Sequence, residues 1–216
     1  MTSKIVVLHG LGGIGKSSIA LEYSFRYSKS YKAVFWVDVT SGTSLSQSVR
    51  GIAENLVANY ARQGVSYDSI ASTLGLRGLL NPDGEIASNE AAEVRVTAAV
   101  KEWLGAQHNE QWLLVLDNYD DVDAVNIHRI LPTCDNGNVI ITSRKSNLQA
   151  LGKKVLVDEI NEQSGTVLPA VQVRTSPDWN RPSSVQSSLL KFRTGIGPVH
   201  NFCALVRNQS GLVWTA

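Results

Sequence analysis

Five short apolar runs stand out in the first 160 residues, and each has the length of a β-strand. The first three are rich in Val, Ile, Leu and aromatic residues and lack the polar alternation of half-exposed strands, so they are typical of strands buried on both faces. A turn signal, Asn136-Gly137, directly precedes the fourth run. We predict strands at residues 5–8, 32–39, 112–116, 138–142 and 153–157.

Apolar residues between these runs recur every three to four positions, which predicts amphipathic helices. Ser44 and Asn89 are suitable N-caps for the second and third helices, and Gly105 is a suitable stop for the third. Residues 63–89 hold several glycines and the turn Asn81-Pro82-Asp83-Gly84, so we expect a short helical piece there, followed by an exposed loop. We predict helices at residues 16–30, 45–60 and 90–104, and shorter ones at 124–131 and 146–151.

Strands that alternate with helices at this spacing predict an α/β fold, in which a mostly parallel five-stranded sheet lies between two helical layers. The pattern ends near Glu162. Residues 163–216 contain four of the six prolines, two serine pairs and only short apolar stretches, at 187–192 and 201–206. We therefore expect one domain over residues 1–162, followed by an irregular, poorly ordered tail over residues 163–216.

Composition narrows the classes of function. The chain is 43% hydrophobic and 18% charged, which fits a globular domain, and its net charge of +1 predicts no strong attraction to nucleic acid or to a membrane surface. No segment approaches the roughly 18 apolar residues of a membrane span. Cys134 and Cys203 have no metal-binding or redox spacing, so we expect free thiols and a cytoplasmic location.

The glycine-rich stretch after the first predicted strand carries the strongest chemical signal, because residues 10–17 match the P-loop pattern G-x-x-x-x-G-K-[ST]. Glycines let the backbone approach an anion, so that N–H groups and a helix N-terminus point at phosphates. The lysine reaches the β- and γ-phosphates, and the serine hydroxyl is a ligand for Mg²⁺. The strand-to-helix context favours this interpretation over a glycine-rich turn with a chance lysine. The predicted nucleotide-binding residues are Gly10, Gly12, Gly13, Gly15, Lys16 and Ser17.

The third predicted strand ends in Asp117, an acid that would orient Mg²⁺ together with Ser17, although a solvated strand-end carboxylate gives the same pattern. Many ATPases of this broad class carry a second carboxylate at the next position to activate water. Here that position is Asn118, whose amide cannot accept a proton. Asp120 and Asp121 are the remaining candidates for water activation, with helix capping as the alternative for both. We therefore expect slow hydrolysis, or hydrolysis that depends on one of these two.

Arg144 follows the fourth predicted strand. A guanidinium at the carboxyl end of a parallel strand, where ligands of such sheets bind, would read the γ-phosphate. The alternative is a surface arginine before a helix. The chain has no N-K-x-D guanine signature, so adenine is the expected base. The predicted catalytic residues are thus Lys16, Asp117 and Arg144, with Asp121 or Asp120 as the water-activating acid.

In combination, these stretches resemble a known family. The order LHGLGGIGKSSIALEY, AVFWVDV, WLLVLDNYDDVD and LPTCDNGNVIITSR is similar to the NB-ARC domain of STAND P-loop NTPases, in the form common in fungal proteins with tetratricopeptide repeats. The resemblance covers roughly residues 4–160 and implies a P-loop NTPase three-layer sandwich, ADP or ATP with Mg²⁺, and a switch whose nucleotide state gates oligomerisation. It places Gly10, Gly15, Lys16 and Ser17 on the phosphate loop, Asp117 on the Mg²⁺ acid, and Arg144 on the strand-4 arginine.

The resemblance stops after Glu162, before the helical subdomain with a G-L-P-L motif and the winged helix that follow in the family. The chain therefore resembles a member truncated after the core, or one altered by an unspliced intron or a shifted frame. Our leading hypothesis is a STAND-type signalling core that hydrolyses ATP slowly, plausibly in defence responses, with adenine nucleotide and related STAND proteins as its partners. The alternatives are a non-enzymatic fragment that docks onto full-length relatives and, more weakly, a small-molecule P-loop kinase.

Overall fold

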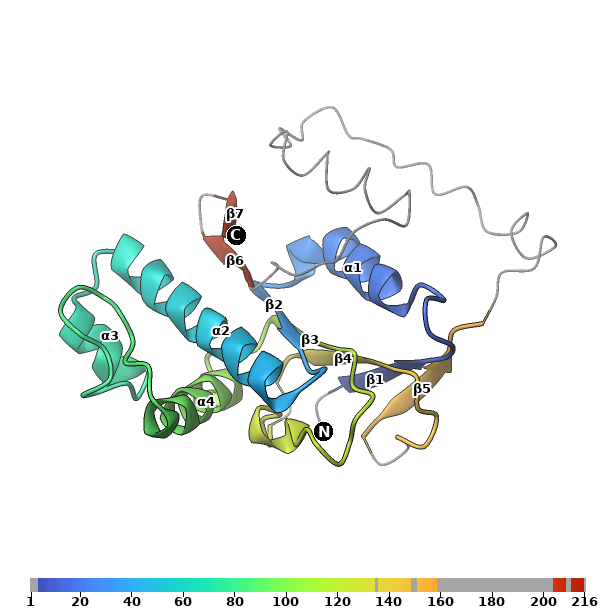
Figure 1. The fold of residues 1–216 in the computed structure, drawn as a ribbon. Coiled ribbons are helices and arrows are strands. Elements are labelled where there is room, and N and C mark those ends of the chain that lie inside the picture. The colour runs from blue at the N-terminus through green and yellow to red at the C-terminus, as the bar shows by residue number, and fades with distance from the viewer. Residues whose placement is uncertain (1–3, 135, 149–150, 159–203, 209–210, 216) are drawn as a thin grey trace. The chain divides into compact units, whose positions relative to one another are not determined.

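The computed structural model describes residues 4–134, 136–148, 151–158, 204–208 and 211–215 (Figure 1). Its centre is a sheet whose strands run in the order β5-β1-β4-β3-β2-β6-β7. The first five strands in this order are mutually parallel, which confirms the predicted α/β fold. They are β1 (Lys4–His9), β2 (Ala33–Asp38), β3 (Trp112–Asp117), β4 (Asn138–Ser143) and β5 (Lys153–Leu156).

The sheet continues beyond β2 with two strands that the sequence did not predict. Strand β6 (Ala204–Asn208) pairs antiparallel with β2, and β7 (Gly211–Thr215) pairs antiparallel with β6. Both are short runs rich in apolar and β-branched residues, and the open edge of β2 offers unpaired backbone groups to the first of them. Most of the predicted irregular tail, including 163–203, lies outside the described residues.

The four α-helices of the described residues fall close to the predicted segments. Helix α4 starts after the predicted cap, since the Asn89 side chain accepts a hydrogen bond from the Ala92 N–H at 2.9 Å. Helix α2 starts earlier than predicted, because Ser41 is its N-cap and accepts from the Ser44 N–H at 3.0 Å. The helices are α1 (Lys16–Arg26), α2 (Gly42–Arg62), α3 (Tyr67–Thr73) and α4 (Glu90–Gly105), and the 3₁₀ turn η1 (Ser28–Ser30) follows α1.

Three local predictions were wrong. The helix expected at 124–131 is only a 3₁₀ turn, η2 (Ile127–Arg129), where the Asn126 side chain binds the His128 N–H and so competes with helical pairing. Residues 146–148 and 151 are not helical. The loop expected to be exposed after α3 buries apolar side chains instead, because its backbone turns back over α2 and α4. These side chains belong to Leu74, Leu76, Leu79 and Ile86.

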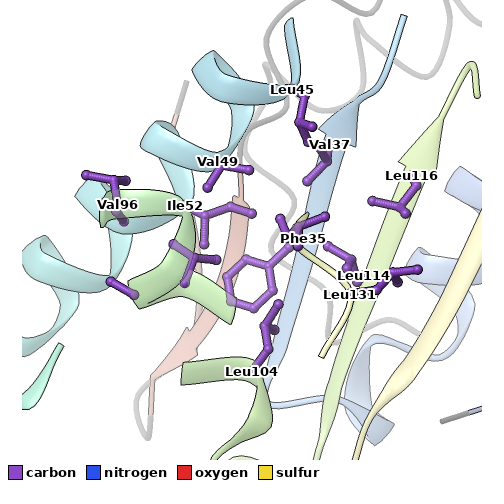
Figure 2. Packing of buried hydrophobic residues seen from close by; sticks show 14 of the residues in the cluster. Phe35, Val37, Leu45, Val49, Ile52, Val96, Leu104, Leu114, Leu116 and Leu131 are labelled. Carbon is purple, nitrogen blue, oxygen red and sulfur yellow. The ribbon is translucent and has the colours of Figure 1, made fainter. Parts of the chain in front are cut away.

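Strand residues alternate between the two faces of the sheet. On one face, Phe35 and Leu114 pack with α2 and α4, and Figure 2 shows Phe35 at the centre of that layer. On the other face, Val34 and Leu113 pack with Ala20 of α1. Period-two alternation therefore produces one helical layer on each side, which is the expected three-layer arrangement. None of the helices in the described part of the chain is long and apolar enough to cross a membrane.

Candidate functional site

The loop between β1 and α1 lies at the carboxyl end of the parallel strands, where ligands of such sheets bind. Its glycines have φ values that other residues rarely adopt, +77° at Gly13 and +99° at Gly15. No described atom lies within 4 Å of the position that a Cβ would take at either glycine. Gly10, in contrast, has no room for a side chain, because a Cβ there would lie 2.2 Å from the Val157 carbonyl oxygen. The loop is thus held tightly at its start and is open to a ligand near α1.

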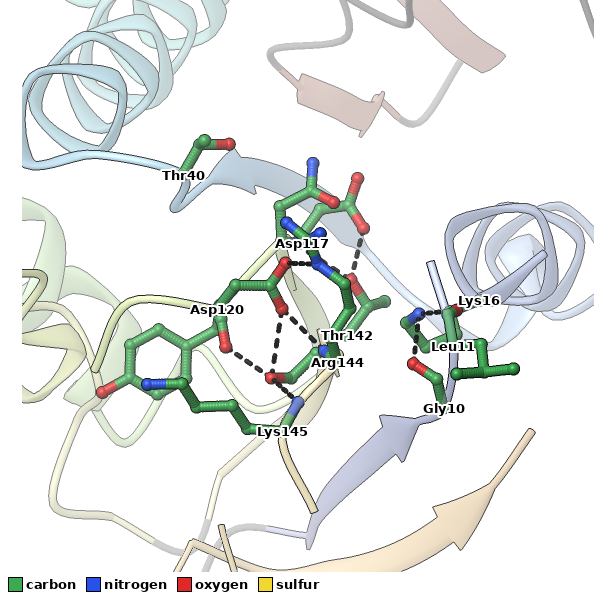
Figure 3. A network of polar contacts seen from close by, with 12 residues as sticks. Gly10, Leu11, Lys16, Thr40, Asp117, Asp120, Thr142, Arg144 and Lys145 are labelled. Carbon is green, nitrogen blue, oxygen red and sulfur yellow. Dashed lines mark hydrogen bonds and ion pairs between the residues drawn. The ribbon is translucent and has the colours of Figure 1, made fainter. Parts of the chain in front are cut away.

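Lys16 is folded back over this loop. Its ammonium donates hydrogen bonds to the carbonyl oxygens of Gly10 at 2.9 Å and Leu11 at 2.7 Å (Figure 3). Burial lowers the pKa of Lys16 below its ordinary value, while the carboxylates of Asp120 and Asp117 partly oppose that shift. The side chain is only 8% exposed, so its charge is directed at the loop rather than at bulk water.

Asp117 joins the loop to the neighbouring strands. One of its oxygens, Oδ1, accepts hydrogen bonds from the Ser17 hydroxyl at 2.7 Å and from the Thr142 hydroxyl at 2.6 Å. Burial raises the pKa of Asp117, and nearby Asp38 raises it further, whereas the two hydroxyl donors lower it. A serine hydroxyl beside a carboxylate is a set of hard oxygen donors, which suits Mg²⁺. The residues present therefore fit the predicted metal.

Thr142 is a site residue that sequence reasoning missed. It bonds Asp117 and also accepts from the Asn118 N–H at 3.0 Å, while Asn118 itself has a positive φ of +65°. The strand register explains this contact. Strands β3 and β4 pair Leu116 with Ile141, so the residues that follow, Asp117 and Thr142, lie next to each other. A hydroxyl at that position of a neighbouring parallel strand can orient the acid.

Arg144 lies beside the phosphate loop, as predicted. A Cβ at Gly12 would be 3.5 Å from the Arg144 Cδ and 4.0 Å from its Nη1. The guanidinium also pairs with the Asp120 carboxylate through Nε. Burial of Asp120 favours its neutral form, but the hydrogen bonds and positive charge of Arg144 outweigh this and lower the pKa of Asp120.

The two acids proposed for water activation have other partners in the structure. Asp120 accepts from both the backbone N–H and the Nε of Arg144. Asp121 accepts from the Ala124 N–H at 3.0 Å, which is the turn-capping alternative. The structure therefore brings Lys16, Ser17 and Asp117 together, and it places Arg144 beside Gly12 of the loop. Their catalytic roles stay predictions.

Comparison with known proteins identifies the family of this chain. The sequence matches the NB-ARC domain family over residues 1–164, which confirms the resemblance seen in the motifs. A nucleotide-binding leucine-rich repeat (NLR)-like protein of Hyaloscypha variabilis (strain UAMH 11265 / GT02V1 / F) is 25% identical over 182 residues. That match covers 76% of this chain but only 16% of the relative. The chain belongs to the NB-ARC domain family, a family of nucleotide-binding cores of signalling NTPases.

Proposed function

We propose that this chain binds ADP or ATP with Mg²⁺ and acts as a nucleotide-dependent signalling domain that hydrolyses ATP slowly. The observation that carries the proposal is the hydrogen bond of 2.7 Å between the Ser17 hydroxyl and Asp117. It joins the end of the P-loop to the acid of a strand that lies 100 positions further along the chain. A glycine-rich turn without a ligand has no need of such a pairing.

Each residue has a distinct part in this proposal. The backbone N–H groups of the loop and the Lys16 ammonium would bind the β- and γ-phosphates, in place of the loop carbonyls that Lys16 contacts here. Ser17 and Asp117 would hold Mg²⁺, and Thr142 would keep the Asp117 carboxylate oriented. When bound, the metal neutralises phosphate charge.

Slow hydrolysis follows from the acids around the site. Activation of water needs a carboxylate that is free to accept a proton. Asn118 has no such group, and Asp120 and Asp121 are engaged with Arg144 and the Ala124 N–H. We therefore propose that the bound nucleotide acts as a regulatory signal rather than as a source of free energy through repeated hydrolysis.

The wider setting is part of the proposal. The relative of H. variabilis is described as NLR-like, and NB-ARC cores of this class gate oligomerisation, so we propose a cytoplasmic signalling role in defence responses. Related STAND chains, or a second copy of this one, would be the protein partners. We also propose residues 1–162 as the nucleotide-binding domain, which agrees with the extent of the family match.

The test is calorimetric titration with Mg·ATP and Mg·ADP of the wild-type chain and of Lys16→Ala. Loss of the buried ammonium should weaken both nucleotides by about 100-fold or more, because a charged phosphate contact is lost from a desolvated site. Lys32→Ala is the matched control, since Lys32 is exposed and precedes β2 at the opposite end of the strands. Wild-type affinity in Lys16→Ala would show that the assignment of the site is wrong.

A further inference from the structure

We infer that Asp120 is a positioning residue for Arg144, holding one edge of the guanidinium so that its other edge reads the terminal phosphate and sets a preference for ATP over ADP. The inference rests on the proposed function, because it concerns the same site. It assigns to Asp120 a role different from water activation. It also predicts that two residues from different loops act as one unit.

The contacts of Asp120 define this unit. Its Oδ1 accepts a hydrogen bond from the Arg144 backbone N–H at 2.6 Å, and its Oδ2 accepts one from the Arg144 Nε. The Ser143 hydroxyl adds a longer bond of 3.3 Å to Oδ1, and the same hydroxyl donates to the Tyr119 carbonyl oxygen. Each oxygen of the carboxylate therefore accepts a hydrogen bond from Arg144, which ties the loop after β3 to the loop after β4.

The other edge of the guanidinium remains available to a ligand. Within the described part of the chain, Nη1 and Nη2 of Arg144 make no hydrogen bond to protein, and the side chain is 65% exposed. Nη1 lies toward Gly12 of the phosphate loop. A guanidinium has five N–H donors in a fixed plane, so fixing Nε also fixes the direction of the two terminal nitrogens. In Figure 3 dashed lines join Arg144 to the Asp120 carboxylate.

Water activation by Asp120 fits these contacts poorly. A general base must accept the proton of a bound water, and both oxygens here already accept from Arg144. The pKa of Asp120 is also lowered by Arg144 despite burial, which makes the carboxylate a weaker base. Both facts favour a positioning role over a catalytic one.

A second effect, charge repulsion by Asp120, opposes the positioning of Arg144. The direction of the measured change in affinity shows which of the two effects is larger. The Asp120 carboxylate is near enough to Lys16 to favour the charged ammonium, so it would also repel an incoming phosphate. If positioning dominates, removal of the carboxylate weakens ATP binding. If repulsion dominates, the same removal tightens it. The Arg144 guanidinium neutralises much of this charge, so we expect positioning to dominate.

The experiment is titration of the full chain with Mg²⁺ and either a non-hydrolysable ATP analogue or ADP. Asp120→Asn replaces one acceptor by an amide NH₂, which cannot accept from the Arg144 Nε. We expect Asp120→Asn and Arg144→Ala each to weaken the ATP analogue by about tenfold. The double variant should be no weaker than either single variant, because the two side chains act as one unit. Affinity for ADP should stay within about twofold of wild type throughout.

Two further variants complete the design. Asp123→Asn is the matched control, because Asp123 is an exposed acid of the same loop with no part in the proposed site, and its affinities should equal those of wild type. Arg144→Lys leaves Asp120 unchanged and tests whether the second edge of the guanidinium is needed. A lysine engaged by Asp120 has no second edge, so we expect the ATP preference to be lost as fully as in Arg144→Ala.

The outcomes separate the alternatives. Unchanged or tighter ATP-analogue binding in Asp120→Asn would overturn the inference, as would additive losses in the double variant or equal weakening of ADP. Unchanged analogue affinity combined with a loss of phosphate release would identify Asp120 as the water-activating acid instead. Should the wild-type chain bind neither nucleotide, the proposed function fails and the inference fails with it. Normal ADP binding with no effect at Asp120 refutes the inference alone.

Discussion

At the scale of single residues, Asp117 carries an electrostatic cost that a bound cation would relieve. Its carboxylate is buried, with 7% exposure, and it has a second acid, Asp38, beside it in the register of β2 and β3. Burial and this neighbour raise the pKa of Asp117, and the Ser17 and Thr142 hydroxyls compensate only in part. In the absence of a cation, an ionised Asp117 is therefore costly to the fold.

We expect Asp117→Asn to stabilise the nucleotide-free chain at neutral pH by roughly 1 kcal/mol, the usual gain from relieving a strained functional site. The direction of the pH dependence follows from the linkage between protonation and folding. A carboxyl whose folded pKa is raised binds more protons when folded, so stability falls as pH rises from the ordinary value of 3.8 through the folded pKa. The advantage of the asparagine variant should thus be present at neutral pH and vanish in acid. Thermal melts across this pH range measure it.

The same variant should lose the part of nucleotide affinity that depends on Mg²⁺, because an amide is a poor ligand for that ion. Titration of ATP with Mg²⁺ and with EDTA separates the two contributions. A variant that is less stable than wild type at neutral pH would show that the Asp117 carboxylate is stabilised by its hydroxyl donors more than burial destabilises it. That result would also contradict the argument that an ionised Asp117 is costly to the fold when no cation is bound.

At the scale of elements, the turn into β4 depends on a glycine for two reasons. Gly137 has φ of +70°, and a Cβ there would lie 2.2 Å from the Trp112 ring. Trp112 is 1% exposed and donates through Nε1 to the Leu104 carbonyl oxygen at 3.0 Å, so its ring has little freedom to move. This turn directs Asn138 into register with β1 and β3, and hence it aligns Thr142 with Asp117.

We predict that Gly137→Ala lowers the free energy of unfolding by about 3 kcal/mol or more, because it adds a steric clash in the core to backbone strain. Gly64→Ala is the matched control. Its φ is +80° but no described atom lies within 4 Å of the added Cβ, so only strain of about 1 kcal/mol should remain. Urea unfolding of both variants gives the comparison. Equal losses would mean that Trp112 yields to the new methyl group.

Much of this fold could be predicted because local and tertiary signals agree. Strands β2, β3 and β4 are continuous apolar runs whose residues are mostly buried, and the Asn89 side chain is placed to cap α4. Strand β5, at the edge of the sheet, is mostly exposed instead. Prediction from the sequence failed where tertiary contacts decide whether a segment is buried. Ile86 has the turn-rich surroundings of an exposed loop, yet the Arg50 guanidinium donates to its carbonyl oxygen at 3.1 Å and holds that segment against α2.

The site shows the same division. Motif residues such as Lys16 and Asp117 could be found because their spacing carries chemistry. Thr142 and the pairing of Asp120 with Arg144 could not be found, since they depend on which strand lies next to which and on loop conformation. A parallel sheet places distant segments side by side, and no local pattern encodes that order.

At the scale of the whole molecule, the site and the added strands lie on different parts of the sheet. The strands that carry the P-loop and its partners, β1, β4 and β3, are adjacent in the sheet. Strand β6 joins at the far side of β2, where its residues 204–206 pair with residues 33–35. All the assigned site residues precede Val157. Ligand binding and completion of the sheet should therefore be separable.

We predict that a fragment of residues 1–162 keeps its affinity for Mg·ADP within about threefold of the full chain but is less stable. Removal of β6 and β7 exposes the backbone groups of β2 at an open edge, which costs hydrogen bonds and invites association between copies. We expect its melting temperature to fall by several degrees, roughly 2–4 °C for each kcal/mol lost. Light scattering should show association that rises with concentration.

Comparison of the fragment with the full chain separates two explanations for any defect. A more than tenfold loss of ADP affinity with an unchanged melting temperature would place part of the site within residues 163–216, which contradicts the proposed domain boundary. Unchanged affinity, stability and association state would mean instead that β6 adds nothing to the sheet in solution. Lower stability with retained affinity is the expected result, because β2 becomes an edge strand in the fragment, whereas Asp117 ends the inner strand β3 and Lys16 begins helix α1.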